Sequence, residues 1–345
     1  MSDSTQSTIK WRCPSNIAII KYWGKKEHQI PANPSVSMTL SAAFTEIEID
    51  LTKKTNPDTV LNYFFEGKKN EAFEKRILHF LPAVSAWLPV LSTHALTINS
   101  HNSFPHSAGI ASSASSFGAL ALGLLDASYP GKYENDRQSF LKEASRIARL
   151  GSGSACRSMA APFCLWGEDE IFSGSNDEYA VPVGPVHPVF QNIADSIIIV
   201  DDSAKAISSS QGHALMKDHE FAAQRFEQAG KHTRELLAIL GTGDWEKFIR
   251  ITESEALTLH AMMMSSPTPF LLMKPGTLSV IQTVQSFRKE ENLPLCFTLD
   301  AGPNVHILYP ADISISVRPL LEEIQKTGNY RIIQDQTGKG PEKLR

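Results

Sequence analysis

The sequence has no apolar run long enough to cross a membrane, and it has few cysteines. Its longest apolar runs, such as SIIIV and ALALGLL, fall far short of the roughly 20 residues that span a bilayer. The opening MSDSTQSTIK lacks the basic-then-apolar profile of a signal peptide. The four cysteines form no CxxC pair, which argues against a disulfide framework. We therefore expect a cytoplasmic protein with reduced thiols and no membrane partner.

An excess of positive charge is also absent, since the formal net charge is -4. We expect no nucleic-acid partner, and any anion site must be a local cluster of positive groups. The eleven histidines are scattered and form no HExxH spacing, so we interpret them as surface or core residues rather than metal ligands. Neither GxxxxGKS nor GxxxxGKT occurs, which argues against a P-loop NTPase.

What the chain does have is the composition of a soluble globular protein, with 42% apolar and 20% charged residues. Its 345 residues exceed the roughly 250 to 300 at which a single core stops growing. The length therefore suits two domains with a cleft between them.

Strand-like and helix-like patterns alternate along the chain and predict an α+β protein. Period-two or buried apolar patterns predict strands at 44–51, 94–100 and 196–202. Longer patterns predict helices at 115–127, 136–150, 218–240 (as one helix or two), 244–264 and 277–293. The Pro-rich segment 181–190 is the candidate linker, which divides the chain into domains at 1–190 and 191–345.

The strongest local signal is FPHSAGIASSASSFGALALGLL at 104–125. Small residues lead directly into a helix, and the unpaired N–H groups of a first helical turn bind phosphate. The serines add hydroxyl donors, one of which could ligate Mg²⁺ beside a nucleotide. A Ser-capped helix with tight packing explains the same residues equally well.

A lysine stands inside the apolar segment CPSNIAIIKYWGKK at 13–26. Lys21 is unusual on a strand unless its ammonium reaches a polar site. A lysine that snorkels at a sheet edge is the alternative.

Two further stretches place a charged group in an unusual setting. RLGSGSACRSM at 149–159 surrounds Arg157 with glycines and serines, and a guanidinium can grip a carboxylate bidentately. LCFTLDAGPNVHIL at 295–308 places Asp300 between a strand and a turn. Taken alone, these are a polar loop and a turn residue.

Together these stretches resemble the GHMP small-molecule kinases, and among them the diphosphomevalonate decarboxylases. The run Gly109-Ile-Ala-Ser-Ser-Ala-Ser115 is similar to the phosphate-binding motif of the superfamily. Asn16 to Lys25, Gly151 to Ser158, SSSQG at 208–212 and DAGPN at 300–304 resemble the decarboxylase branch. The motifs follow the family's order over most of the chain.

The resemblance implies the two-domain GHMP kinase fold. Its N-terminal domain is like the second domain of ribosomal protein S5, and its C-terminal domain is ferredoxin-like. It also implies ATP-dependent decarboxylation of (R)-5-diphosphomevalonate to isopentenyl diphosphate, with MgATP as cofactor and a homodimer as the assembly. The implied alternatives are a mevalonate 5-phosphate decarboxylase, a related mevalonate kinase, and a catalytically silent paralogue that binds phosphorylated metabolites.

The resemblance also assigns roles to individual residues. The implied catalytic residues are Asp300, Lys21, Arg157, Asn16 and Ser112. The implied substrate-binding residues are Tyr22, Trp23, Gly24, Lys25, Arg76, Ser152, Gly153, Ser154, Ala155, Cys156, Arg157 and Ser210. ATP would be bound by Gly109, Ile110, Ala111, Ser112, Ser113, Ala114 and Ser115, with Ser113 as a ligand of Mg²⁺.

The chain also departs from the family pattern. Ala161 and Pro162 stand where two glycines are usual, and His213 stands where Met is usual. Because Pro has no N–H and fixes its own backbone, the Ala-Pro change bears on substrate affinity more than on reaction type.

Overall fold

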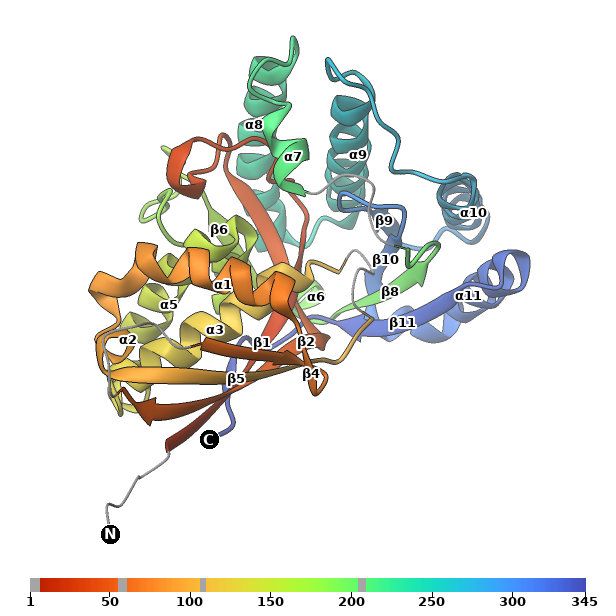
Figure 1. The fold of residues 1–345 in the computed structure, drawn as a ribbon. Coiled ribbons are helices and arrows are strands. Elements are labelled where there is room, and N and C mark those ends of the chain that lie inside the picture. The colour runs from red at the N-terminus through yellow and green to blue at the C-terminus, as the bar shows by residue number, and fades with distance from the viewer. Residues whose placement is uncertain (1–6, 55–60, 106–109, 204–208) are drawn as a thin grey trace.

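A computed structural model describes residues 7–54, 61–105, 110–203 and 209–345. Its larger sheet has eight strands, in the order β12-β1-β2-β5-β3-β4, with β6 paired to β2 and β7 paired to β6 (Figure 1). The strands are β1 (Ser7–Ala18), β2 (Ser35–Lys53), β3 (Leu61–Phe65), β4 (Lys68–Lys69), β5 (His94–Asn102), β6 (Phe163–Trp166), β7 (Val181–Pro182) and β12 (Glu342–Lys343).

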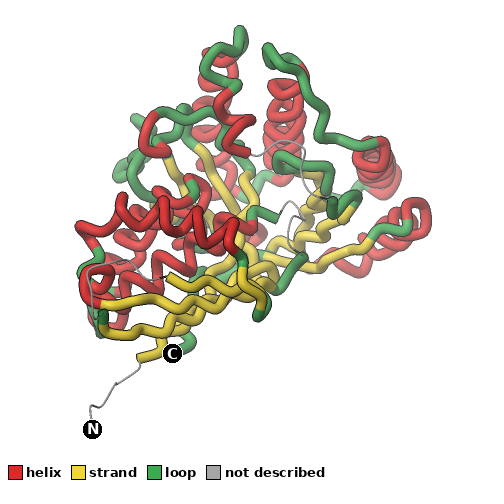
Figure 2. The backbone as a smooth tube through the Cα atoms, in the orientation of Figure 1, coloured by secondary structure: helices red, strands yellow, loops and turns green. Residues whose placement is uncertain are grey.

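Helices gather on one face of this sheet, where α1 (Glu71–Val84), α3 (Ser112–Ser128) and α5 (Arg137–Gly151) lie (Figures 1 and 2). α3 packs between β1, β2 and α5, so every residue from Ala114 to Asp126 is buried. This explains why its sequence is rich in Ala and Leu all round rather than along one stripe. The shorter elements of this half are α2 (Val90–Thr93), α4 (Lys132–Asn135), η1 (Glu27–Gln29), η2 (Ser85–Trp87) and η3 (Gly153–Met159).

The second sheet is antiparallel, with strands in the order β11-β8-β10-β9. Numbered along the chain, this is the order 4-1-3-2 of the predicted ferredoxin-like topology. Its strands are β8 (Ile193–Ile199), β9 (Cys296–Thr298), β10 (Val305–Pro310) and β11 (Arg331–Gln336). Its helices and turns are α6 (Pro188–Gln191), α7 (Ser209–Ala214), α8 (Ala222–Thr242), α9 (Trp245–Met264), α10 (Pro275–Glu291), η4 (Ala311–Ile313) and α11 (Ser314–Gly328).

A shared core joins the two sheets. Ile17 and Met38 of the first sheet lie in the same buried cluster as Phe190, Ile197 and Phe248 of the second half. The chain also returns at its end, because β12 pairs with β1 in the larger sheet. The sequence did not indicate this return, and the domain limits at 1–190 and 191–345 stay a prediction.

The expected α+β class is confirmed, and the helices predicted at 115–127, 136–150, 244–264 and 277–293 all occur within a few residues of their predicted bounds. The strand predicted at 196–202 is displaced, since β8 spans Ile193–Ile199. The expected linker at 181–190 is not a plain connection: it contains β7 and the start of α6. Among the described residues, no helix combines the length and apolarity needed to cross a membrane, and all four cysteines are buried and free.

Candidate active site

A cavity of about 440 Å³ lies where the first sheet's helices meet α7, α9 and the turn after β9. Its walls come from segments far apart in the sequence, so only the folded chain brings them together. The lining residues are Asn16, Ala18, Lys21, Tyr22, Trp23, Lys25, Gln29, Arg76, Ala111, Ser113, Gly151, Ser152, Gly153, Ser154, Arg157, His213, Leu259, Asp300 and Ala301.

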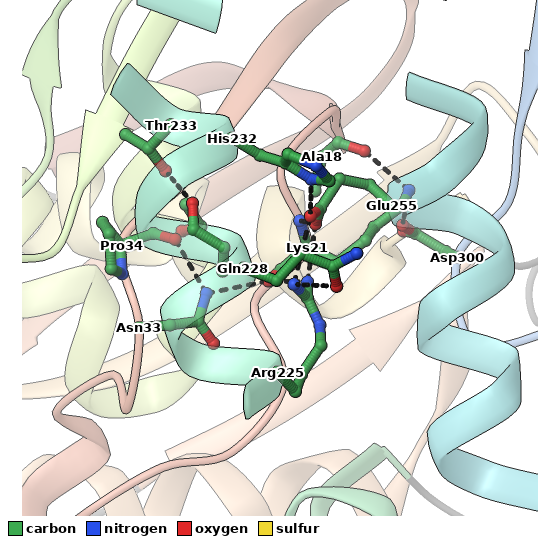
Figure 3. A network of polar contacts seen from close by, with 12 residues as sticks. Ala18, Lys21, Asn33, Pro34, Arg225, Gln228, His232, Thr233, Glu255 and Asp300 are labelled. Atoms are coloured by element: carbon green, nitrogen blue, oxygen red, sulfur yellow. Dashed lines mark hydrogen bonds and ion pairs between the residues drawn. The ribbon is translucent and has the colours of Figure 1, made fainter. Parts of the chain in front are cut away.

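A buried lysine meets a carboxylate in this cavity (Figure 3). Lys21 follows the end of β1 rather than lying on the strand, and it is only 1% exposed. Its Nζ donates to the carbonyl oxygen of Ala18 at 2.6 Å and lies 3.2 Å from Asp300 Oδ1. Burial lowers the pKa of Lys21, and the nearby Asp300 carboxylate partly offsets this effect.

The turn after β9 holds Asp300 in place. The Gly302 N–H donates to the Asp300 carbonyl oxygen at 2.7 Å, and His260 Nε2 lies 3.1 Å from the same oxygen. The Asp300 side chain remains 26% exposed, so its carboxylate can reach a ligand as well as Lys21.

Arg157 is a buried cation on the wall of the cavity. It is 4% exposed, and its guanidinium donates to Asn16 Oδ1 at 3.4 Å and to Ser35 Oγ at 2.8 Å. No carboxylate of the described chain lies within ion-pair distance of it. Because a buried charge is normally paired, an anionic ligand is the expected partner.

The Asn16 amide, which accepts from the Arg157 guanidinium, is itself held by two hydrogen bonds. Its Nδ2 donates to Ser158 Oγ at 2.9 Å and to the Ser154 carbonyl oxygen at 3.2 Å. These bonds fix the orientation of the amide, so its oxygen faces Arg157.

The loop after Lys21 begins with Tyr22, whose buried Oη has no hydrogen-bond partner in the described part of the chain. Gly24 adopts a φ of +98°, and its N–H donates to His213 Nδ1 at 3.0 Å. Burial lowers the pKa of His213 to about 3, so its ring is neutral, accepts through Nδ1 and carries its proton on Nε2.

Serine hydroxyls line the cavity close to Tyr22, since Gly153 between two of them packs against the Tyr22 ring. Ser152 Oγ lies 3.3 Å from Ser113 Oγ and 3.4 Å from Ser154 Oγ. Ala111 precedes α3 with a φ of +46° and supplies no side-chain cap. The Ala114 N–H donates to the Ala111 carbonyl oxygen at 2.7 Å, and no side chain caps the N–H groups before it, where a helix start can bind an anion.

Several predicted residues lie beside the cavity rather than on its wall. Ile110, Ala114, Ala155 and Cys156 are buried beneath the surface of the site, and Ser112 and Gly24 also lie off the wall. The Ser115 hydroxyl lies 2.7 Å from Thr45 Oγ1, in the packing between α3 and β2. Gly109 and the Ser210 side chain lie outside the described residues.

The other predicted substrate-binding residues line the cavity: Tyr22, Trp23, Lys25, Arg76, Ser152, Gly153, Ser154 and Arg157. Some lining residues were not predicted from the sequence. Arg76 is exposed on α1, with its guanidinium 5.2 Å from the Phe73 ring centre. The lining residues without a predicted role are Ala18, Gln29, Gly151, His213, Leu259 and Ala301. For His213, its departure from the family pattern was the available signal.

The comparisons with known proteins point to one family. The model for the diphosphomevalonate decarboxylase-like N-terminal domain matches residues 13–180, and the model for the mevalonate 5-diphosphate decarboxylase C-terminal domain matches 196–343. The diphosphomevalonate decarboxylase of Saccharomyces cerevisiae is 32% identical over 327 residues, covering 89% of this chain and 79% of the relative. That of Ganoderma lucidum is 30% identical over 337 residues, covering 91% of this chain and 80% of the relative.

The chain belongs to the diphosphomevalonate decarboxylase family. Solved structures of this family share its two-domain architecture. The mevalonate diphosphate decarboxylase from Staphylococcus aureus superposes with a TM-score of 0.84 at 28% identity, covering 99% of each chain. A structure described as "MDDEF in complex with MVAPP, AMPPCP and Magnesium" superposes with a TM-score of 0.83 at 28% identity, covering 99% of this chain and 100% of that one. The resemblance to the decarboxylase family and its fold is thereby confirmed.

Proposed function

We propose that this member of the family decarboxylates (R)-5-diphosphomevalonate. The products are isopentenyl diphosphate, ADP, phosphate and CO2, formed through transient phosphorylation of the 3-hydroxyl. The observation that carries the proposal is the Lys21–Asp300 contact of 3.2 Å, in a cavity that also holds the buried guanidinium of Arg157.

The first step needs a base, because a tertiary hydroxyl must lose its proton as it attacks the γ-phosphoryl group. The position of Asp300 on the cavity wall and its partly exposed carboxylate support this role. The Lys21 ammonium, 3.2 Å from that carboxylate, can balance phosphate charge nearby.

The second step needs the substrate carboxylate held still. Loss of the 3-phosphate leaves positive charge on carbon 3, and the C–C electron pair of the carboxylate moves towards it as CO2 departs. Arg157 and Asn16, which contact each other at 3.4 Å, can grip the carboxylate from one side of the cavity. The Asp300 anion also stabilises the developing positive charge.

The diphosphate of the substrate would lie against the loop from Tyr22 to Lys25. Tyr22 Oη, which has no partner among the described residues, suits a phosphate oxygen, and the Lys25 side chain also lines the cavity. Ser152, Ser154 and the exposed Arg76 lie on the same wall and add donors. Ser210 stays a prediction from the resemblance alone.

The start of α3 fits the phosphates of ATP, because its first-turn N–H groups have no side-chain cap. Magnesium, when bound, neutralises charge on the transferring phosphoryl group. The described residues contain no cluster of three His, Cys, Asp or Glu side chains that could hold a metal. The Mg²⁺ ion would therefore be held by nucleotide phosphates and a hydroxyl such as that of Ser113.

The proposal has two further parts, a homodimer, which the resemblance supports, and a cytoplasmic location, which the cysteine content supports. The buried, free cysteines suit a reducing compartment. Light scattering during size-exclusion chromatography tests the dimer, and a monomer at micromolar concentration would contradict it.

The substrate assignment is tested by supplying MgATP with either 5-diphosphomevalonate or mevalonate 5-phosphate. We expect isopentenyl diphosphate, identified by mass spectrometry, and a higher kcat/KM for the diphosphate. A higher kcat/KM for the monophosphate would overturn the substrate and leave the reaction type intact.

A further inference from the structure

A fully buried ion pair on α8 and α9 contacts the backbone of Lys21 (Figure 3). Arg225 of α8 and Glu255 of α9 have completely buried side chains and form two charged hydrogen bonds, at 2.5 and 3.0 Å. His232 Nδ1 lies 2.7 Å from Glu255 Oε1. Burial opposes ionisation of Glu255, but the His232 hydrogen bond and the Arg225 charge lower its pKa overall, so it is an anion.

Both polar backbone groups of Lys21 are bound by side chains. The Lys21 N–H donates to Glu255 Oε2 at 2.9 Å. The Lys21 carbonyl oxygen accepts from Arg225 at 3.4 Å and from Asn33 Nδ2 at 3.0 Å. Within β1, pairing with the neighbouring strand would satisfy these groups. Lys21 lies beyond the end of β1, so its N–H and carbonyl need other partners.

These contacts place the Lys21 ammonium relative to Asp300. Arg225 and Glu255, together called the clamp below, belong to the second half of the chain, as does Asp300. Lys21 belongs to the first half. The clamp therefore ties the Lys21 backbone to α8 and α9. Because α9 packs on β9, and Asp300 follows β9, Lys21 is held at a defined position relative to Asp300. An apolar pair of similar volume would fill the same space, but it could neither accept the Lys21 N–H nor donate to its carbonyl.

We propose that the buried Arg225–Glu255 pair positions Lys21 for catalysis by clamping its backbone from α8 and α9. The proposal rests on the proposed function, because it takes the Lys21–Asp300 contact as part of the reaction. Arg225 and Glu255 are positioning residues, since neither lines the cavity.

The test is a double-mutant cycle of Glu255→Gln and Lys21→Met. Glu255→Gln alone is expected to lower kcat about 10²-fold, as misplacement of a catalytic group by about 1 Å can do. KM for the substrate is expected to change less than about threefold, because the lost interaction acts in the transition state. In the Lys21→Met background, Glu255→Gln is expected to lower kcat no further.

If the pair has only a structural role, Glu255→Gln should lower kcat by the same factor in the wild-type and Lys21→Met backgrounds. That result would overturn the proposal, as would a Glu255→Gln variant with unchanged kcat. Asp126→Asn is the matched control, since Asp126, like Glu255, is a buried carboxylate paired with a cation, here Lys343. It lies near the end of α3, about 20 Å along the helix from Ser112, and should leave kcat within about twofold.

If Glu255→Gln does not fold, Arg225→Lys takes its place in the cycle. Lysine keeps the charge of the pair but lacks the fork that reaches both Glu255 and the Lys21 carbonyl, so kcat should again fall with KM nearly constant. CO2 and ADP are both measured in every sample. Absence of CO2 from the wild type would refute the proposed function, and the same cycle measured on ADP formation would still test the positioning of Lys21.

Discussion

Replacing Asp300 with Asn removes a charge and little else. The amide oxygen can still accept a hydrogen bond from Lys21 Nζ, which lies 3.2 Å from Asp300 Oδ1. The backbone contacts of residue 300 with Gly302 and His260 use its carbonyl oxygen and are unaffected. We expect turnover to fall at least ~10²-fold, because a positioned base contributes about that much.

The structure sets the energy available for this effect. Two unit charges 3.2 Å apart attract by about 5 kcal/mol at an effective dielectric constant of 20. Solvent screening at the Asp300 side chain, which is 26% exposed, reduces that figure. A 10²-fold loss in turnover corresponds to about 2.7 kcal/mol, which lies within the energy available.

The assay compares turnover with nucleotide binding. ADP formation gives kcat for the variant, and isothermal titration calorimetry gives its affinity for an unreactive ATP analogue, which should stay within a few fold of the wild type. Asp312→Asn, at an exposed carboxylate of η4, is the control and should behave as the wild type. Near-normal turnover of Asp300→Asn would remove Asp300 from the mechanism.

Three further predictions concern Lys21, Tyr22 and Gly153. Burial lowers the pKa of Lys21 in the folded protein below its usual 10.5. Between the folded and the unfolded pKa, the unfolded chain therefore binds more protons than the folded one. In that pH window Lys21 makes the free energy of unfolding rise with pH. Urea unfolding across that window should show a shallower rise for Lys21→Met, and identical slopes would refute the reasoning. Tyr22→Phe removes a buried hydroxyl that has no partner within the described ranges, so Tm should not fall, whereas KM for the substrate should rise about tenfold. An unchanged KM would show that this hydroxyl does not contact the substrate. A Cβ at Gly153 would lie 2.9 Å from Tyr22 Oη, so Gly153→Ala should lower the free energy of unfolding by about 1–3 kcal/mol in urea, while Gly241→Ala, with open space around it, should not.

The helices and the site motifs could be predicted because their signals are local. The segment 244–264 has apolar residues at helical spacing, and α9 spans Trp245–Met264. The Asp-Ala-Gly-Pro-Asn turn likewise follows from its own residues, and the structure places Asp300 at the cavity. Such features need no knowledge of which other segment packs against them.

The contacts between distant segments could not be predicted in this way. Lys21 was considered as a strand residue, but its place beyond β1 depends on Glu255 and Arg225, more than 200 residues away. The pairing of β12 with β1 joins the two ends of the chain and has no local pattern.

One signal for the buried pair was nevertheless present. Glu255 lies on the same face of α9 as the buried Ile251 and Leu259, and Arg225 lies on the buried face of α8 with Ala229. A charged residue within an apolar stripe is rarely buried without a partner. The two helices could therefore have been matched through their charges, although the contact with Lys21 could not.

The most direct test of the account is the ratio of CO2 to ADP during turnover of 5-diphosphomevalonate labelled at its carboxyl carbon. The account predicts equal amounts of labelled CO2 and ADP, because phosphorylation by ATP precedes each decarboxylation. ADP formed without labelled CO2 would contradict the assignment of this chain as a decarboxylase.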